Sequence, residues 1–359
     1  MLGQMRVQRA RAQACAKSHC MGAARRCIAA CRDAPVLVTG ASGYLAMNVI
    51  QRLQDRGFRV RGTVRSLQND AKIAPLRACF PDLELVEADL LGESTRAWEV
   101  AMQGCKYVQH CASPFINVVK DPQRELIDPA VNGTDKVMRA AAAVGITRVV
   151  LTSSVAAVGP PQPWYHEPYE LEALGPDSWN TTSTLQDGPY RLSKRLAEER
   201  AWQIAKSYQQ LSLVSICPAL VIGPMIGNRA DGTSVQLIKD LLDGTLKKTG
   251  CSGVCRALVD VRDIAHCHVA AMELPAAAGH RFIASSDDSL TDVEIADRLR
   301  ESANFSAYPL PMDGPRPSYR PSYDCSLARD MLGFNPIPVA ASLRDMASSA
   351  VRQGIVAKV

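Results

Sequence analysis

The sequence contains no long hydrophobic run. None of its stretches approaches the roughly eighteen consecutive apolar residues that a membrane-spanning helix needs. Of its 359 residues, 47% are hydrophobic and 21% are charged, which is the balance of a water-soluble globular protein with room for one large domain or two unequal ones. We therefore expect no membrane partner.

Acidic residues are absent from the first 32 positions. This stretch holds seven basic side chains, so it accounts for the formal net charge of +5, and the rest of the chain carries about −2. Such a balance does not indicate a nucleic-acid partner. We interpret residues 1–33 as a basic N-terminal extension, either a disordered upstream segment or an organelle-targeting peptide, since such peptides are rich in arginine and poor in acids. The expected location is the cytoplasm, with an organelle as the alternative.

The twelve cysteines follow no metal-binding pattern. Six of them are scattered through the expected core elements, which is typical of buried thiols in a reducing compartment: Cys79, Cys105, Cys111, Cys217, Cys267 and Cys325. Cys251, Cys255, His266, Cys267 and His268 come nearest to a ligand set, but their spacing matches no closed zinc pattern. Two histidines two positions apart on a helix also point away from each other. We expect no metal.

The most informative stretch that is present is VLVTGASGYLA at 36–46. An apolar strand runs into Gly40 and Gly43, and helical apolar spacing begins after the small Ala46. The glycines permit a tight turn and close approach of the main chain to a ligand, and the free amides at the helix start favour a pyrophosphate. The stretch therefore predicts a dinucleotide site. The residues expected to contact the cofactor here are Gly40, Ser42, Gly43, Tyr44 and Leu45.

Strands and helices alternate along the rest of the chain. A helix from Tyr44 stops at Gly57, and a helical stretch from 123 to 143 is interrupted by Pro129. This order predicts an α/β fold with a doubly wound parallel sheet. After residue 223 the pattern becomes irregular, with a strand at 258–263 that returns to the sheet. The other expected strands are 58–64, 83–87, 107–111, 148–152 and 211–216, and the other expected helices are 191–208, 264–272 and two exposed ones at 291–302 and 340–352.

Basic residues follow the second strand. In folds that bind NAD, an acidic residue at this place accepts a hydrogen bond from the free ribose 2′-hydroxyl. Arg65 stands at the end of that strand, Arg61 lies within it and Lys72 follows further on. A cation at this place accommodates a 2′-phosphate, so the sequence favours NADP(H) over NAD. The alternative is that these residues are solvated charges at the end of a strand.

The ends of the third and fourth strands fall on the same side as the glycine turn. Asp89-Leu90 follows the third strand, and Ala112-Ser113 follows the fourth. Because ligands of open parallel sheets bind outside the carboxyl ends of the strands, we expect Asp89 to meet the adenine amine and Ala112 to meet the phosphates or a ribose. Asp89 as a cap of the next helix is the alternative.

A serine, a tyrosine and a lysine provide the candidate chemistry. Ser153-Ser154 ends the fifth strand, and a proline-rich loop from 159 to 188 separates it from Tyr190 and Lys194, which lie four apart on one helix face. The lysine charge favours the tyrosine phenolate, so Tyr190 is suited to give a proton to a carbonyl oxygen as hydride arrives from a nicotinamide. A serine hydroxyl would hold that oxygen as negative charge develops.

These motifs together resemble the extended short-chain dehydrogenases/reductases. Within them the chain is most similar to the dihydroflavonol-reductase-like branch, which includes cinnamoyl-CoA reductases and aldehyde or methylglyoxal reductases. The resemblance extends from about residue 35 to the C-terminus. Its motifs are TGASGYLA at 39–46, Asp89-Leu90, His110 to Pro114, TSS at 152–154, Tyr190 with Lys194, Pro218 with Gly223-Pro224, and VDVRD at 259–263.

The resemblance implies a domain arrangement. It implies an NADP(H)-binding Rossmann domain at 34–222, to which 258–275 returns, and a smaller C-terminal substrate-binding domain formed by 223–257 and 276–359. It also implies a small carbonyl compound as substrate. A monomer and a homodimer remain equally compatible with the sequence.

The resemblance also implies roles for individual residues. Ser154 rather than Ser153 corresponds to the catalytic serine, Tyr190 and Lys194 to the active-site pair, Arg65 to the 2′-phosphate contact and Pro218 to the loop beside the nicotinamide, and Lys194 also reaches the nicotinamide ribose. Two departures are the N-terminal extension and the segment 249–255, which lacks the usual proline-rich pattern.

Two other functions remain open. A sugar-nucleotide epimerase or dehydratase uses the same three catalytic residues with tightly bound NAD, against which Arg65 argues. A sensor or scaffold that binds NADP without turnover would not need the intact set. The substrate itself is set by segments 155–188 and 225–257, whose conformation the sequence does not reveal.

Overall fold

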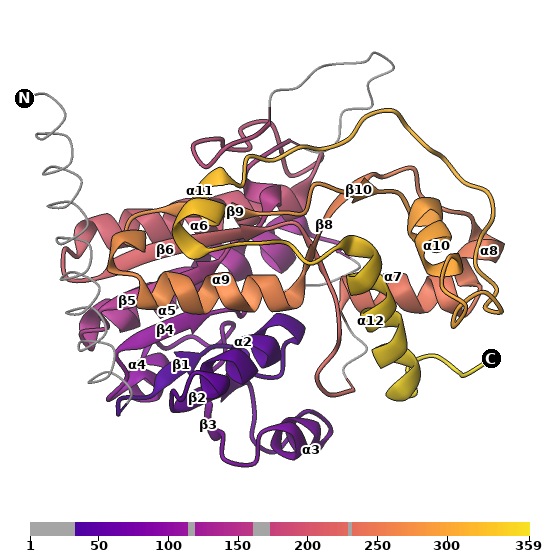
Figure 1. Cartoon of the computed structure of the whole chain (residues 1–359). Helices are drawn as coiled ribbons and strands as arrows, with labels where there is room; N and C mark the ends of the chain where they lie inside the picture. Colours follow the sequence, from indigo (N-terminus) through magenta and orange to yellow (C-terminus); the bar gives the residue numbers. More distant parts are fainter. Residues whose placement is uncertain (1–32, 114–118, 161–172, 229–231) are drawn as a thin grey trace, which may run out of the picture.

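The computed structural model describes residues 33–113, 119–160, 173–228 and 232–359 (Figure 1). The expected N-terminal extension up to residue 32 and much of the proline-rich loop therefore lie outside the described residues. Among the helices that are described, none is long and apolar enough to cross a membrane.

A seven-stranded sheet forms the centre of the molecule, and all of its strands are parallel. Its order is β3-β2-β1-β4-β5-β6-β9, so the direction of winding reverses between β1 and β4, which is where ligands bind in such sheets. The predicted Rossmann-type α/β fold is confirmed. The strands are β1 (Val36–Val38), β2 (Val60–Val64), β3 (Glu84–Glu87), β4 (Tyr107–His110), β5 (Arg148–Thr152), β6 (Ser212–Pro218) and β9 (Arg281–Ala284).

Helices cover both faces of this sheet (Figure 1). On one face, apolar residues of α2, α3, α9 and α11 pack into a common core, and on the other face α4, α5 and α6 do so. Pro129 lies in the first turn of α5, where its missing amide is tolerated, and a π-helical turn, η1 (Gln123–Ile127), precedes it. The helices are α2 (Tyr44–Asp55), α3 (Asp70–Cys79), α4 (Arg96–Met102), α5 (Asp128–Ala143), α6 (Pro189–Ser207), α9 (Val261–Glu273) and α11 (Ser326–Leu332), with short 3-10 turns η2 (Val155–Ala157) and η3 (Pro275–Ala277).

A smaller unit lies at the carboxyl ends of the strands and has a separate hydrophobic core. Its three-stranded sheet, in the order β10-β8-β7, contains the strand that we expected to return to the main sheet; only α9, which follows it, packs there. The elements of this unit are β7 (Leu220–Ile222), α7 (Thr233–Leu242), α8 (Thr245–Thr249), β8 (Arg256–Asp260), β10 (Ser289–Leu290), α10 (Asp292–Arg300) and α12 (Val339–Arg352).

Two details of the C-terminal half differ from the sequence-based expectation. Helices α10 and α12 are not exposed: Leu299 and Leu343 are 0% exposed because each helix turns an apolar face into the small core. The strand β9, which sequence reasoning placed with the C-terminal segment, pairs with β6 as the edge of the main sheet. Both outcomes depend on pairing with distant residues, which a local pattern does not specify.

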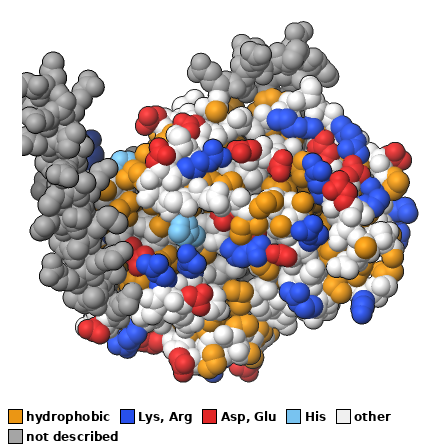
Figure 2. All heavy atoms as spheres, viewed as in Figure 1, with side chains coloured by type: hydrophobic (Ala, Val, Ile, Leu, Met, Phe, Trp, Pro, Cys, Tyr) orange, Lys and Arg blue, Asp and Glu red, His pale blue; other side chains and the backbone are white. Residues whose placement is uncertain are grey.

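The molecular surface carries interspersed charges. Figure 2 shows acidic and basic side chains alternating over the face that α9 and α12 form. Several of them are paired across elements: Arg56, the C-cap residue of α2, contacts Glu273 of α9 at 2.9 Å, and Arg262 of α9 contacts Asp345 of α12 at 2.8 Å. Exposed pairs of this kind typically contribute less than about 1 kcal/mol each, so the three buried cores are the main source of stability.

Candidate active site

A cavity of about 900 Å³ lies between the carboxyl ends of the strands and the small C-terminal unit. Apart from Arg61, the structure brings together along its wall the residues that the sequence predicted to bind the cofactor or to act in catalysis. They come from eight separate chain segments, so the fold rather than sequence proximity assembles them. These lining residues are Gly40, Ser42, Gly43, Tyr44, Leu45, Arg65, Lys72, Asp89, Leu90, Ala112, Ser113, Ser154, Tyr190, Lys194 and Pro218.

The glycine turn is shaped for close approach of a ligand. Gly40 has φ of +64°, and a Cβ built on it would lie 3.0 Å from Cβ of Ala112, at the end of the neighbouring strand. Gly43 is the N-cap of α2 and provides no side-chain cap, so the first-turn amides of the helix are available to an anion. These features fit the pyrophosphate of a dinucleotide.

Tyr44 lines the cavity and also hydrogen-bonds to a distant part of the chain. Its hydroxyl donates a 2.7 Å hydrogen bond to the carbonyl oxygen of Gly223, and burial, followed by the nearby Asp260 charge, raises its pKa well above the ordinary value. The neutral phenol therefore ties α2 to the start of the C-terminal unit.

The basic residues after β2 separate into two groups. Arg65 and Lys72 line the cavity, and Arg65 is exposed. Arg61 does not line it: its guanidinium forms an ion pair with Glu84 at 2.7 Å and donates to the carbonyl oxygens of Ala101 and Gln103. The idea that Arg61 meets a 2′-phosphate is wrong, because Arg61 lies early in the strand and not at its carboxyl end.

Asp89 stands at the end of β3 and lines the cavity. Its Oδ1 accepts a 3.0 Å hydrogen bond from the amide of Leu91, which orders the turn after the strand. Helix α4 begins only at Arg96, and its N-cap is Thr95, so the alternative that Asp89 caps the next helix is wrong.

Ser153 and Ser154 are adjacent but have different surroundings. The buried hydroxyl of Ser153 donates a 2.6 Å hydrogen bond to Oε2 of Glu198. Ser154 is the N-cap of the short turn η2, and its Oγ accepts a 3.1 Å hydrogen bond from the amide of Ala156. The Ser154 hydroxyl proton is not used in that bond, so this serine, rather than Ser153, is suited to donate to a ligand in the cavity.

Tyr190 and Lys194 occupy the first two turns of α6. The left-handed Gly188, with φ of +80°, precedes the helix, and Pro189 starts it. Nζ of Lys194 lies 6.0 Å from the centre of the Tyr190 ring and donates a 3.1 Å hydrogen bond to Oγ of Ser113. The ammonium is thus held between the tyrosine and the end of β4.

A buried ion pair, which sequence reasoning missed, supports this helix face. Glu198 lies one turn beyond Lys194, and its carboxylate accepts Nε of Arg281 at 2.8 Å and Nη2 at 3.1 Å. Arg281 also donates to carbonyl oxygens of the 176–178 loop and covers the Trp179 ring at 3.9 Å. The available signal was a glutamate at i+4 from Lys194, on the same face of an otherwise amphipathic helix.

Two buried histidines form part of the framework beneath the cavity. His110 contacts Oγ1 of Thr39 at 2.9 Å, and His268 contacts Thr152 at 3.0 Å and Gln109 at 2.9 Å. Burial lowers the pKa of both imidazoles to about 3, with the Lys194 charge as a second cause for His110. Both side chains are therefore neutral at physiological pH and act as fixed hydrogen-bonding groups.

The two histidines that we compared with metal ligands have other partners. His266 contacts the carbonyl oxygen of Leu332, on the side of α9 opposite His268. Within the described ranges, no group of three His, Cys, Asp or Glu side chains is placed to hold a metal ion.

Comparison with known proteins identifies the family. Residues 36–284 match the NAD dependent epimerase/dehydratase family. The chain belongs to this family. This family member is 34% identical to a cinnamoyl-CoA reductase of Medicago truncatula over 322 residues, which cover 88% of this chain and 94% of that protein. It is also 34% identical to cinnamoyl-CoA reductase 1 of Arabidopsis thaliana, with 90% of both chains covered.

Solved structures agree with this assignment. Gre2 of Candida albicans in complex with NADPH has a TM-score of 0.76 to this family member at 28% identity, and the match covers 89% of this chain and 99% of that one. The yeast methylglyoxal/isovaleraldehyde reductase Gre2 complexed with NADPH also has a TM-score of 0.76, at 24% identity, and shows the common fold. The expected place in the dihydroflavonol-reductase-like branch of the extended short-chain dehydrogenases/reductases is confirmed.

Proposed function

We propose that the protein is an NADPH-dependent reductase that acts on the carbonyl group of an aldehyde, ketone or dihydroflavonol-like compound, with Tyr190 as the proton donor. The observation that carries this proposal is the opening of Ser154, Tyr190 and Lys194 into the same cavity as the glycine turn. The names of the relatives, cinnamoyl-CoA reductases among them, support a reductase. The solved Gre2 complex supports NADPH as the cofactor.

Separate parts of the cavity would hold the cofactor. The α2 start and the Gly40 turn would hold the pyrophosphate, Arg65 and Lys72 would hold the 2′-phosphate, and Lys194 and Pro218 would hold the nicotinamide half. When bound, the reduced nicotinamide supplies the hydride. The close approach of Ala112 leaves no room for a side chain at Gly40, in agreement with a glycine turn that binds the pyrophosphate.

Three side chains would act on the carbonyl oxygen. Ser154 donates a hydrogen bond that strengthens as negative charge develops there. Tyr190 gives its proton to that oxygen, and the Lys194 ammonium nearby favours the phenolate that remains. Ser113 holds the ammonium in position through its 3.1 Å hydrogen bond.

An assay distinguishes this function from the alternatives. Aldehydes, ketones and dihydroflavonols supplied with NADPH should be converted to alcohols with stoichiometric consumption of NADPH. An epimerase with retained NAD would convert a sugar nucleotide without net consumption of cofactor, and a sensor would bind NADPH without turnover. The cationic Arg65 at the end of β2 and the names of the relatives favour the reductase over both.

Removing Arg65 should change the cofactor preference. We expect Arg65→Ala to weaken NADPH binding by about ten- to a hundredfold and to leave NADH nearly unchanged, because hydrogen bonds to a charged phosphate are lost. Isothermal calorimetry with both cofactors measures this. The matched control is Arg77→Ala, an exposed arginine of α3 that does not line the cavity. Equal losses for NADPH and NADH would assign Arg65 a purely structural role.

A further inference from the structure

The substrate end of the cavity contains an arginine that no described carboxylate pairs with. Arg191 follows Tyr190 directly on α6 and lines the cavity. Its Nη1 donates a 3.1 Å hydrogen bond to the carbonyl oxygen of Gly159. Among the described residues, no carboxylate lies within ion-pair distance of it. Because the wall is partly buried, this guanidinium has also lost part of its hydration.

A second arginine at this end of the cavity is neutralised by a carboxylate. Arg256 also lines the wall, but it pairs at 2.5 Å with Asp292, whose side chain is 3% exposed. Of the carboxylates in the described ranges, Asp89 alone lines the cavity, and it belongs to the adenosine end. The described residues of the substrate end therefore carry a net positive charge that centres on Arg191.

Two tyrosines face the same region. Tyr319 and Tyr323 line the cavity, and no hydrogen bond joins either hydroxyl to a described residue. Burial raises the pKa of Tyr323 to about 12, and the Arg191 charge opposes this rise in both tyrosines, so the guanidinium acts on both phenols. Both remain neutral and available as hydrogen-bond donors at physiological pH.

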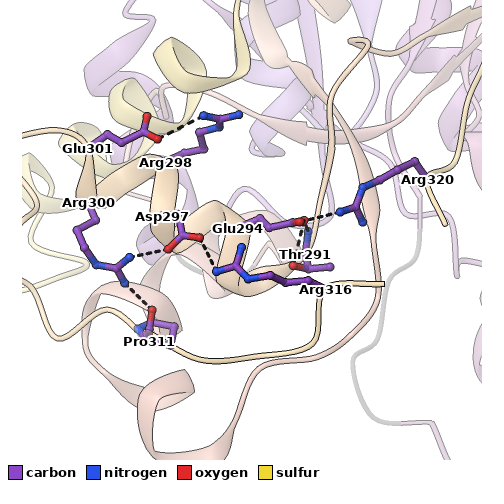
Figure 3. A network of polar contacts seen from close by, with 9 residues as sticks. All are labelled: Thr291, Glu294, Asp297, Arg298, Arg300, Glu301, Pro311, Arg316 and Arg320. Atoms are coloured by element: carbon purple, nitrogen blue, oxygen red, sulfur yellow. Dashed lines mark hydrogen bonds and ion pairs between the residues drawn. The ribbon is translucent and has the colours of Figure 1, made fainter. Parts of the chain in front are cut away.

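The segment that carries these tyrosines is anchored on both sides. Figure 3 shows that Arg316 pairs with Asp297 and Arg320 with Glu294, both on α10. On the other side, backbone hydrogen bonds join Leu174 to Ser322 and Asp324. The backbone that carries the two phenols is therefore anchored before any ligand binds, which reduces the entropic cost of using them.

We propose that Arg191, Tyr319 and Tyr323 form an anion-binding subsite that selects carbonyl substrates bearing a carboxylate. The planar guanidinium matches a carboxylate in a two-point contact, and the two phenols supply further donors. The subsite rests on the proposed reductase function, since it would orient the substrate by the end remote from the carbonyl next to Tyr190. Arg191 follows Tyr190 directly on α6. Binding of the anion at Arg191 is therefore linked to the position of the proton donor.

Matched aldehydes test this subsite. We expect wild-type protein with NADPH to reduce 3- or 4-formylbenzoate with a kcat/KM about ten- to a hundredfold above that for the corresponding methyl ester, the usual effect of hydrogen bonds to a charged group. Arg191→Ala should lose this preference and retain the rate with the methyl ester, and Arg191→Lys should keep part of it. The control Arg195→Ala removes a charge from the same helix, but Arg195 pairs with Glu199 and does not line the cavity.

The outcomes separate the subsite from the reductase function. Equal rates for acid and ester in the wild type, or equal losses for both in Arg191→Ala, would overturn the subsite while leaving reduction established. If no aldehyde is reduced, the reductase function fails, and calorimetric binding of benzoate and of isophthalate to the wild type and to Arg191→Ala then decides the subsite. Binding at least about tenfold weaker in the variant supports it, and unchanged binding overturns it.

Discussion

Replacement of Tyr190 by phenylalanine is expected to lower the turnover of carbonyl reduction by about 10²- to 10⁴-fold, the usual effect of removing a placed general acid. The change deletes one oxygen and keeps the ring, so the packing at the start of α6 and the binding of NADPH should be preserved. Steady-state kinetics with an aldehyde gives the turnover, and fluorescence titration with NADPH gives the affinity. The two readouts distinguish loss of the proton donor from loss of the site.

The oxidative direction and the neighbouring lysine provide the controls. Oxidation of the alcohol requires the phenolate, so its rate should rise with pH in the wild type, and this rise should be missing in Tyr190→Phe. Lys194→Ala should reduce both turnover and NADPH affinity, because its ammonium is assigned to the tyrosine and to the ribose. Near-normal turnover in Tyr190→Phe would be incompatible with the mechanism, and water or the Ser154 hydroxyl would then have to supply the proton.

The second large effect is expected from the buried ion pair beneath the catalytic helix. Arg281→Met should lower the free energy of unfolding by about 3 to 5 kcal/mol, since it leaves the Glu198 carboxylate without its partner in a site where that side chain is 0% exposed. The side chain of methionine fills similar space but cannot bind the 176–178 carbonyl oxygens. Urea denaturation followed by circular dichroism measures the change.

Two variants show whether the unpaired charge causes this loss. Arg56→Met removes an ion pair with Glu273 in which the arginine is 47% exposed, and it should cost less than about 1 kcal/mol. The double variant Glu198→Gln/Arg281→Met removes the buried charge as well and should recover part of the stability. If Arg281→Met cost no more than Arg56→Met, the pair would not support the fold as described.

The sequence was sufficient for the parts of the molecule that local patterns determine. The strands of the first half are short apolar runs that end at turn residues, and the Gly40 turn and the Tyr190–Lys194 spacing each lie within one element. The structure places the Gly40 turn and the Tyr190–Lys194 pair along one cavity, as expected from the rule that ligands bind at the carboxyl ends of parallel strands.

Long-range pairing decided what the sequence did not reveal. Arg61 is directed to the carbonyl oxygens after α4, because its position in β2 is early in the strand. Glu198 and Arg281 are 83 residues apart, and only the pairing of β9 with β6 brings them together. The same applies to Arg191 and the 319–323 segment, whose proximity results from the anchoring of that segment to α10.

The most direct test of the central claim is the transfer of deuterium from labelled NADPH. The protein is incubated with an aldehyde and NADPH that carries deuterium at both hydrogen positions of the hydride-donating carbon of the nicotinamide, and the alcohol is analysed by mass spectrometry. A carbonyl reductase yields an alcohol with one deuterium on the former carbonyl carbon, in amounts equal to the NADPH consumed, and Tyr190→Phe yields far less in the same time. Absence of deuterium from the product, or no consumption of NADPH with any aldehyde, ketone or dihydroflavonol, would contradict the proposed function.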